Sequence, residues 1–425
     1  MHSTSLSILK TICFCCLAFN CTEQKVFNKN ISVMDTLFYK DGLPITIKIE
    51  DGKIKKLIRP NPIENRVSKE VIYVAPGLID HQVNGYLSHS FVGEDLNTEK
   101  IKIITQSFWE NGITTFLPTL TSEPNEVLLR NFKILDRILE DEHLAQSIPG
   151  FHLEGPYISP VDGFRGAHNQ AYIHNPNWLE FDTWNQASGN RIKEVTIAPE
   201  QKGALEFIEK CVENNIKVAL GHTNASADQI KSAVDLGATI STHLGNGCAN
   251  LINRHHNPIW PQLAEDKLFA SIIVDGFHLT KEEVQSFYKV KGPENTILVS
   301  DITRWAGMPP GTYSDFGQEV IVTDDGAIMM PSENVLAGAS FLITRGIENI
   351  IRFTKCSLAE AIDMATKNPA KALNLNDRGE IAIGKRADLI YFKFDSGKLK
   401  ILKTIVAGEV VFVDKTIKEL YKDSH

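Results

Sequence analysis

Four apolar runs in the middle of this chain each end on a side chain that can bind a metal or transfer a proton. These side chains, in chain order, are Glu154, His222, His243 and Asp301, and the runs before them are residues 147–153, 217–220, 239–242 and 296–300. Polar groups at the carboxyl ends of successive strands are typical of an active site at one end of a (β/α)8 barrel. A carboxylate with two imidazoles suits a hydrolytic metal ion.

Eight strand-like segments occupy the middle of the chain. They are residues 77–83, 114–118, 149–153, 195–198, 217–220, 239–242, 270–274 and 296–300. Helical patterns lie between most of them, and residues 226–229 open one such helix with capping-box spacing. The pattern predicts an α/β chain with a (β/α)8 barrel over residues 76–377, and a doubly wound open sheet is the alternative.

Both ends of the chain are rich in strands instead. Residues 45–49 alternate apolar and polar side chains, and Asp51-Gly52 follows them as a hairpin signal. Residues 388–392, 402–406 and 410–412 form a similar series near the C-terminus. Residues 26–75 and 378–425 are therefore predicted to form one small β-sandwich domain beside the barrel.

The first residues resemble a targeting signal. Lys10 precedes an apolar run at residues 11–19 that is too short to span a bilayer, and Cys21 follows. We expect residues 1–21 to be a signal peptide, with Cys21 as the lipid-anchored residue of an exported lipoprotein facing the periplasm. The alternatives are an ordinary signal peptide, or a cytoplasmic protein that starts near Met34.

Charge and composition narrow the partners. The net charge is −8 and no long basic block occurs, so nucleic acid is not expected as a partner. A hydrophobic content of 43% permits a large core.

Glu154, His222 and His243 would hold one divalent ion and leave a position open for water, beside which Asp301 would lie.

Several motifs occur in a particular order along the chain. They are residues 152–156 (His-Leu-Glu-Gly-Pro), 221–225 (Gly-His-Thr-Asn-Ala), 242–244 (Thr-His-Leu), 275–278 (Asp-Gly-Phe-His), 300–301 (Ser-Asp) and 378–389. From about residue 35 to its end the chain resembles the N-acetylglucosamine-6-phosphate deacetylase family of the amidohydrolase superfamily. The resemblance implies hydrolysis of N-acetylglucosamine-6-phosphate to glucosamine-6-phosphate and acetate, by a homodimer.

The resemblance also implies roles for individual residues. It implies that Glu154, His222 and His243 are the metal ligands and that Asp301 transfers protons. It also implies that His278 polarises the acetamide carbonyl. The residues implied to line the sugar pocket are Ala167, His168, Asn246, Gly247, Arg254, His278, Leu336, Ala337 and Gly338. An arginine at the position of Arg254 meets the phosphate in the family.

A second metal position is predicted to be vestigial. Most amidohydrolases carry His-x-His after the first barrel strand, whereas this chain has Gln82 and Asn84 there. Neutral amides are weak ligands for a transition metal, so one ion per subunit is expected, zinc first and Fe²⁺, Co²⁺ or Mn²⁺ as alternatives. His81 lies one residue away and, by strand alternation, is expected to point to the opposite face.

Two other functions stay open at this point. The same ligands would serve an amidohydrolase that acts on an unphosphorylated N-acetylhexosamine or another N-acyl compound. A non-catalytic sugar-binding protein is the remaining reading, and the intact metal set together with Asp301 argues against it.

Overall fold

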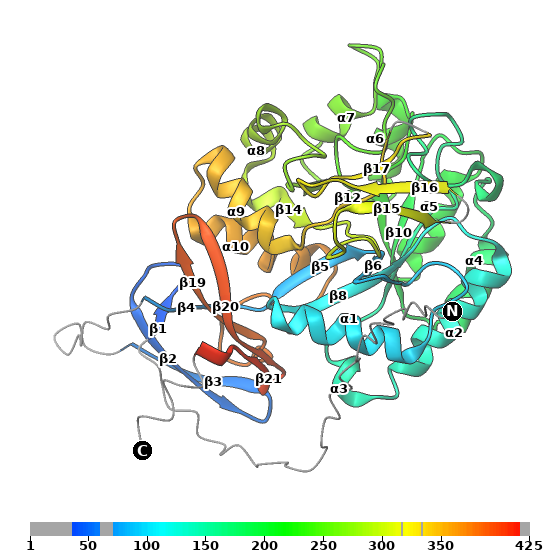
Figure 1. The fold of residues 1–425 in the computed structure, drawn as a ribbon. Helices are drawn as coiled ribbons and strands as arrows, with labels where there is room; N and C mark the ends of the chain where they lie inside the picture. Colours follow the sequence, from blue (N-terminus) through cyan, green and yellow to red (C-terminus); the bar gives the residue numbers. More distant parts are fainter. Residues whose placement is uncertain (1–35, 60–70, 316–317, 333–334, 417–425) are drawn as a thin grey trace, which may run out of the picture. The chain divides into compact units, whose positions relative to one another are not determined.

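Eight parallel strands form a barrel at the centre of the chain, shown in the computed structural model of Figure 1. The structure describes residues 36–59, 71–315, 318–332 and 335–416. The barrel strands are β5 (Leu78–Val83), β8 (Ile113–Leu120), β9 (Phe151–Glu154), β10 (Ile192–Ile197), β11 (Lys217–Leu220), β12 (Ile240–Ser241), β13 (Phe269–Ile273) and β14 (Thr296–Val299). They are hydrogen-bonded in sequence order, and a parallel bridge from Val83 to Ile302 joins the two ends. The predicted barrel is confirmed.

Helices cover the outside of the barrel, so its strands are buried on both faces and consist mostly of apolar runs. The helices are α1 (Thr98–Glu110), α2 (Asn125–Ile138), α3 (Glu142–Ala145), α4 (Trp178–Ala187), α5 (Ala204–Glu213), α6 (Ala227–Asp235), α7 (Ile259–Ala264), α8 (Lys281–Asn295), α9 (Ile343–Thr354), α10 (Leu358–Met364) and α11 (Lys367–Ala372), with a 3-10 turn η2 (Gln170–Tyr172). The predicted capping box is present on α6, where Ser226 and Gln229 bond each other's backbone. No helix in the described part of the chain is long and apolar enough to cross a membrane.

The two ends of the chain build one seven-stranded sheet, in the order β21-β20-β19-β4-β1-β2-β3. Its strands are β1 (Thr36–Phe38), β2 (Pro44–Glu50), β3 (Lys53–Ile58), β4 (Tyr73–Pro76), β19 (Leu389–Asp395), β20 (Lys398–Val406) and β21 (Glu409–Val413). The predicted Asp51-Gly52 hairpin joins β2 to β3, and both residues have positive φ. Ile45 and Ile54 share a small core with Leu389 and Ile405, so the sheet folds back on itself as a sandwich.

The terminal sheet and the barrel share one apolar core. Phe392 and Ile401 of the sheet belong to the same buried cluster as Phe108 and Phe116 of the barrel layer. Thr404 Oγ1 donates to the carbonyl of Trp109 at 2.6 Å. The sandwich is therefore packed against the barrel instead of being joined by a linker alone.

Two small sheets that the sequence did not predict lie in the loops after the first and last barrel strands. They are the hairpin β6 (Gly85–Tyr86) with β7 (His89–Ser90), and the sheet β15 (Gly311–Asp315), β16 (Gln318–Val322), β17 (Ile328–Met330) and β18 (Val335–Leu336), coloured yellow in Figure 1. Met329, Met330 and Leu336 from the larger sheet line the same cavity as Glu154. These insertions therefore form part of the wall at the carboxyl end of the barrel.

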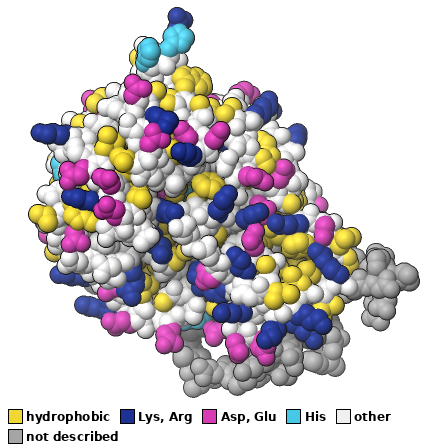
Figure 2. Space-filling model, turned by 180° about the vertical axis from the view of Figure 1, so that it is seen from behind, with side chains coloured by type: hydrophobic (Ala, Val, Ile, Leu, Met, Phe, Trp, Pro, Cys, Tyr) yellow, Lys and Arg dark blue, Asp and Glu magenta, His cyan; other side chains and the backbone are white. Residues whose placement is uncertain are grey.

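Charged side chains are mixed on the surface. On the face in Figure 2, basic and acidic side chains alternate without gathering into a patch of one sign. The predicted signal peptide, residues 1–21 with Cys21, and the alternative start at Met34 lie outside the described residues. The ends of the predicted sandwich segments, residues 26–35 and 417–425, lie outside them too.

Candidate active site

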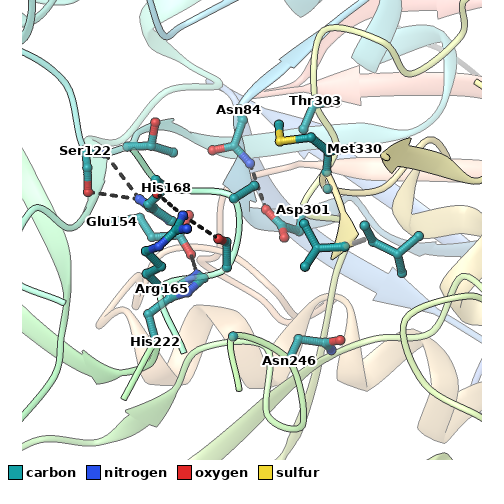
Figure 3. A pocket seen from close by; sticks show the side chains of 18 of the residues that line it. Asn84, Ser122, Glu154, Arg165, His168, His222, Asn246, Asp301, Thr303 and Met330 are labelled. Atoms are coloured by element: carbon teal, nitrogen blue, oxygen red, sulfur yellow. Dashed lines mark hydrogen bonds and ion pairs between the residues drawn. The ribbon is translucent and has the colours of Figure 1, made fainter. Parts of the chain in front are cut away.

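The four predicted strand-end side chains line one cavity of about 1330 Å³. Glu154 is the last residue of β9, and His222, His243 and Asp301 follow β11, β12 and β14 by two residues each. Glu154, His222 and His243 are buried and Asp301 is half-buried, and Figure 3 shows Glu154, His222 and Asp301 facing the same space. The parallel strands bring these distant parts of the sequence together because their carboxyl ends share one end of the barrel.

Glu154, His222 and His243 converge within hydrogen-bonding distance of one another. Glu154 Oε1 lies 3.0 Å from His243 Nε2 and 3.3 Å from His222 Nε2, and the two Nε2 atoms are 3.1 Å apart. One carboxylate oxygen and two imidazole nitrogens aimed at one point are the donor set that zinc and similar ions prefer. These residues therefore fit a divalent metal ion.

The surroundings of His222 orient it for this purpose. Its Nδ1 lies 3.0 Å from the carbonyl oxygen of Phe164, so the proton belongs on Nδ1 and the lone pair on Nε2. A Cβ on Gly166 or Gly247 would come within 2.8 Å of the His222 ring. Both loops can approach the imidazole this closely only because they carry glycine there.

Charge in the cluster favours the ionised carboxylate. Burial alone would raise the pKa of Glu154, but the hydrogen bonds and charges of His222 and His243 outweigh burial and hold that pKa well below its usual range. A carboxylate that stays ionised while buried is ready to bind a cation.

His168 lies closer to this cluster than its predicted place in the sugar pocket suggested. One of its ring nitrogens is within 4.8 Å of ligand atoms of Glu154 and His222. Its Nδ1 lies 2.9 Å from Ser122 Oγ (Figure 3). Burial, helped by the neighbouring His222, lowers the pKa of His168 to about 3, so the ring is neutral. His168 thus lines the cavity as a neutral hydrogen-bonding group beside the cluster.

Three of the four strand-end residues have a left-handed backbone. The φ angles are 48° at His222, 31° at His243 and 51° at Asp301. Such conformations are strained for residues other than glycine and collect at functional sites. Hydrogen bonds hold them here, among them Asp301 N to the Gln82 carbonyl at 3.0 Å and His243 N to Ser271 Oγ at 2.8 Å.

Asp301 is half-buried and lines the same cavity as the cluster. Burial, followed by the negative charge of Glu154, raises the pKa of Asp301 to about 8. Asn84 Nδ2 donates to Asp301 Oδ1 at 2.7 Å, a contact drawn in Figure 3. An aspartate with a raised pKa that shares a cavity with a metal set can accept and return a proton.

Gln82 and Asn84, which were predicted to mark a vestigial second metal position, bind two carboxylates of the site. Gln82 Nε2 donates to Glu154 Oε1 at 2.8 Å, and Asn84 donates to Asp301. Both side chains turn an N–H group towards a carboxylate, whereas a metal ion needs a lone pair. This arrangement disfavours a second ion beside Glu154.

The prediction for His81 is wrong. Its Nδ1 lies 2.7 Å from Glu194 Oε2 on β10, and both side chains are almost completely buried. Strands β8 and β9 separate β5 from β10 in the sheet, so this contact crosses the barrel interior. The pairing of β5 with β8 is irregular between Asp80 and Val83, and this bulge breaks the alternation that the prediction assumed.

Arg254, predicted to line the sugar pocket, lies elsewhere. It is exposed and is not among the residues that line the cavity. The segment between β12 and α7 projects from the molecule beside α7 in Figure 1. Asn253 Oδ1 accepts from the backbone N–H groups of His255 and His256, and Trp260 Nε1 donates to the Arg254 carbonyl. These turns direct the segment outwards, which the family resemblance did not reveal.

The other predicted pocket residues do line the cavity. They are Ala167, His168, Asn246, Gly247, His278, Leu336, Ala337 and Gly338. His278 Nδ1 lies 2.8 Å from Asp275 Oδ2, and the other oxygen of Asp275 accepts from the backbone N–H of Phe277 and of His278. Asp275 was not predicted as a site residue, although its place in the Asp-Gly-Phe-His motif was a signal.

Known proteins resemble this chain over most of its length. The family model described as "Amidohydrolase family" matches residues 73–411. The N-acetylglucosamine-6-phosphate deacetylase of Bacillus subtilis (strain 168) is 30% identical over 383 residues, which cover 88% of this chain and 94% of that protein. The N-acetylgalactosamine-6-phosphate deacetylase of Escherichia coli O157:H7 is 28% identical over 355 residues, 83% of this chain and 90% of that protein.

A solved structure shares the fold. The N-acetylglucosamine-6-phosphate deacetylase of Thermotoga maritima aligns with a TM-score of 0.78 and 29% identity, covering 90% of this chain and 99% of that one.

Proposed function

Because this chain belongs to the amidohydrolase family, and within it to the N-acetylglucosamine-6-phosphate deacetylases, we propose that it hydrolyses N-acetylglucosamine-6-phosphate to glucosamine-6-phosphate and acetate. The observation that carries the proposal is the convergence of Glu154, His222 and His243 in one cavity that Asp301 also lines. A metal set beside a proton-transfer group is what amide hydrolysis requires.

Glu154, His222 and His243 would hold one divalent ion, which we propose to be zinc, with Fe²⁺, Co²⁺ or Mn²⁺ as alternatives. When bound, such an ion lowers the pKa of water and polarises a carbonyl group. Because Gln82 and Asn84 present N–H groups to Glu154 and Asp301, one ion per subunit is proposed.

Asp301 would carry the proton through the reaction. It would accept a proton from the attacking water and donate it to the amide nitrogen as the tetrahedral intermediate collapses. Asn84 holds one carboxylate oxygen, so the other, Oδ2, is the atom proposed to transfer the proton. Its orientation by Asn84 would place that oxygen towards the cavity.

His278 would stabilise the developing negative charge on the carbonyl oxygen. With Nδ1 donating to Asp275, its Nε2 is the atom available to the substrate. Asp275 would thus act as a positioning residue, much as a carboxylate orients the histidine of a hydrolase triad.

A direct test measures acetate release from N-acetylglucosamine-6-phosphate by protein of known metal content. His222→Ala is expected to lose both metal and activity, because it removes one of three ligands. Undiminished metal in this variant would contradict the assignment. Metal binding without any acetate release by wild-type protein would favour a sugar-binding protein instead.

One observation favours a second candidate, an amidohydrolase acting on an unphosphorylated N-acetylhexosamine or another N-acyl compound. Arg254, the residue expected to meet the phosphate, lies outside the cavity. Comparing kcat/KM for N-acetylglucosamine-6-phosphate, N-acetylgalactosamine-6-phosphate and N-acetylglucosamine would separate these substrates. A higher value for the unphosphorylated sugar would establish the second candidate.

Export and assembly are further proposals that rest on the sequence. If residues 1–21 are a lipoprotein signal, Cys21→Ser should move the protein from the membrane fraction to a soluble or unprocessed form. Unchanged fractionation with Met1 retained would favour a cytoplasmic protein. The homodimer implied by the family can be tested by analytical ultracentrifugation.

A further inference from the structure

Strand β5 closes the barrel against the segment that carries Asp301. A parallel bridge joins Val83 to Ile302, and the backbone N–H of Asn84 donates to the Ile302 carbonyl at 2.8 Å. The backbone N–H of Asp301 donates to the Gln82 carbonyl at 3.0 Å, and the Asn84 side chain donates to Asp301 Oδ1 at 2.7 Å (Figure 3). The position of Asp301 therefore depends on β5 as well as on its own strand, β14.

Asp80 of β5 binds the chain directly before Asp301. Its side chain is completely buried, and its Oδ1 accepts from the backbone N–H of Ser300 at 3.2 Å and from that of Gln82 at 3.4 Å. One carboxylate oxygen thus joins the first barrel strand to the residue that precedes the proton carrier.

The backbone at Asp301 needs such support. Its φ of 51° lies in the left-handed region, which is unfavourable for an aspartate and persists only where neighbouring groups fix it. If the hydrogen bond to Ser300 were lost, the turn could relax. The Asp301 carboxylate would then rotate away from its present direction.

Packing alone does not explain an aspartate at position 80. Burial raises the pKa of Asp80 to about 6, against hydrogen bonds from Ser300 that lower it. The second carboxylate oxygen, Oδ2, is buried and has no hydrogen-bond partner among the described residues. A buried carboxylate that is only partly hydrogen-bonded destabilises a fold, so an apolar side chain would suit this position better for stability.

Other contacts fix β5 itself from across the barrel and from β9. His81 Nδ1 lies 2.7 Å from Glu194 Oε2 on β10, and His152 Nδ1 on β9 lies 3.2 Å from the His81 carbonyl. Asp80 is therefore attached to a strand that is held independently of β14. It can act as a fixed point for the turn at Asp301.

We propose that Asp80 is a positioning residue for the reaction, which holds the Asp301 carboxylate in its working direction by accepting from the Ser300 N–H. This inference rests on the proposed deacetylase function. Asp80 is not among the described residues that line the cavity, so it would act through Asp301 and would not touch the substrate.

The test compares acetate release from N-acetylglucosamine-6-phosphate by wild type, Asp80→Ala and Asp80→Asn. We expect Asp80→Ala to lower kcat roughly 10- to 100-fold, the effect of a small misplacement of a reacting group, with little change in KM. Metal content should stay at the wild-type value, because Asp80 contacts none of the three proposed ligands. Asp80→Asn should recover most of the loss, because its amide oxygen can still accept from Ser300.

A double variant distinguishes positioning from a general structural role. In an Asp301→Asn background, adding Asp80→Ala should cause no further fall in kcat, because both changes act on the same group. A further fall as large as in the wild-type background would show that Asp80 does not act through Asp301. If Asp80→Ala fails to fold, Asp80→Ser replaces it in every comparison, since its side chain is one bond shorter and moves the oxygen away from Ser300.

Asn368→Ala is the matched control. Asn368 is also buried, and its Nδ2 donates to the Thr296 carbonyl at 2.7 Å, which holds β14 at its opposite end. This variant should lower the melting temperature and leave kcat unchanged. The inference is wrong if Asp80→Ala keeps the wild-type kcat, if Asn368→Ala lowers kcat equally, or if Asp80→Asn is as impaired as Asp80→Ala. Absence of acetate release by wild type would instead refute the proposed function itself.

Discussion

The His81–Glu194 pair allows a quantitative prediction about the barrel interior. Both side chains are almost completely buried, and their contact crosses the barrel interior. Removing one partner of a buried ion pair leaves the other charge unpaired, which costs about 3–5 kcal/mol, whereas replacing both with apolar residues is often neutral or stabilising. We therefore expect His81→Leu and Glu194→Leu each to destabilise strongly, and the double variant to be close to wild type.

The expected change in melting temperature follows from the size of the chain. Unfolding entropy of about 2 cal/mol/K per residue converts 3–5 kcal/mol into a fall of roughly 4–6 °C for a protein of this length. The assay is urea and thermal unfolding of metal-free protein, because bound metal would add its own stabilisation. Single variants as stable as the double variant would show that the two residues are not coupled, and would refute the reasoning.

The same pair predicts how this coupling depends on pH. Burial alone would lower the pKa of His81, but the Glu194 carboxylate outweighs it and raises the pKa above 6.5. Burial alone would raise the pKa of Glu194, but His81 outweighs it and lowers the pKa below 4.5. The stability that His81 contributes is complete below pH 6.5 and is lost as the pH rises through its raised pKa. The stability that Glu194 contributes is complete above pH 4.5 and is lost as the pH falls through its lowered pKa. The coupling energy between His81 and Glu194 should therefore be largest between pH 4.5 and pH 6.5.

Three further predictions concern the site directly. Asp301→Asn should lower kcat by roughly 10²–10⁴-fold with little change in KM and no loss of metal; near-normal kcat would rule out Asp301 as the proton carrier. Replacing both Gln82 and Asn84 with histidine should add a second metal equivalent per subunit, because imidazole lone pairs replace amide N–H groups; elemental analysis that still finds one ion would contradict this. Gly247→Ala should weaken metal binding by about 10–100-fold in a chelator competition, since the new Cβ would press on the His222 ring, and unchanged affinity would show that the loop yields instead.

The parts of the fold that sequence predicted well are those with an uninterrupted local signal. Buried parallel strands are rich in apolar residues, so all eight barrel strands could be located, and Glu154, His222, His243 and Asp301 lie at the carboxyl ends of four of them. The insertions between β14 and α9 and after β5 were missed because their strands are short, exposed on one side or interrupted by turns. Nothing in their periodicity separates them from loops.

The predictions for the site were wrong where a sequence pattern was used to infer the position of a side chain. His81 was assigned by alternation, which a bulge in β5 interrupts. Arg254 was assigned by the family resemblance, but side-chain bonds in its loop turn the segment outwards. His168 approaches His222 through a long loop after β9, a contact that no local pattern encodes.

The order of strands in the terminal sheet has a consequence for biosynthesis. Strand β4 pairs with β1 on one side and with β19 on the other, and these partners are separated by more than three hundred residues. While the ribosome is still making the barrel, the side of β4 that faces β19 has no partner and exposes a strand edge able to join another nascent chain. The last-made segment therefore acts as the closure of a sheet begun at the start of translation, and a product truncated before Leu389 would keep a permanently open, aggregation-prone edge.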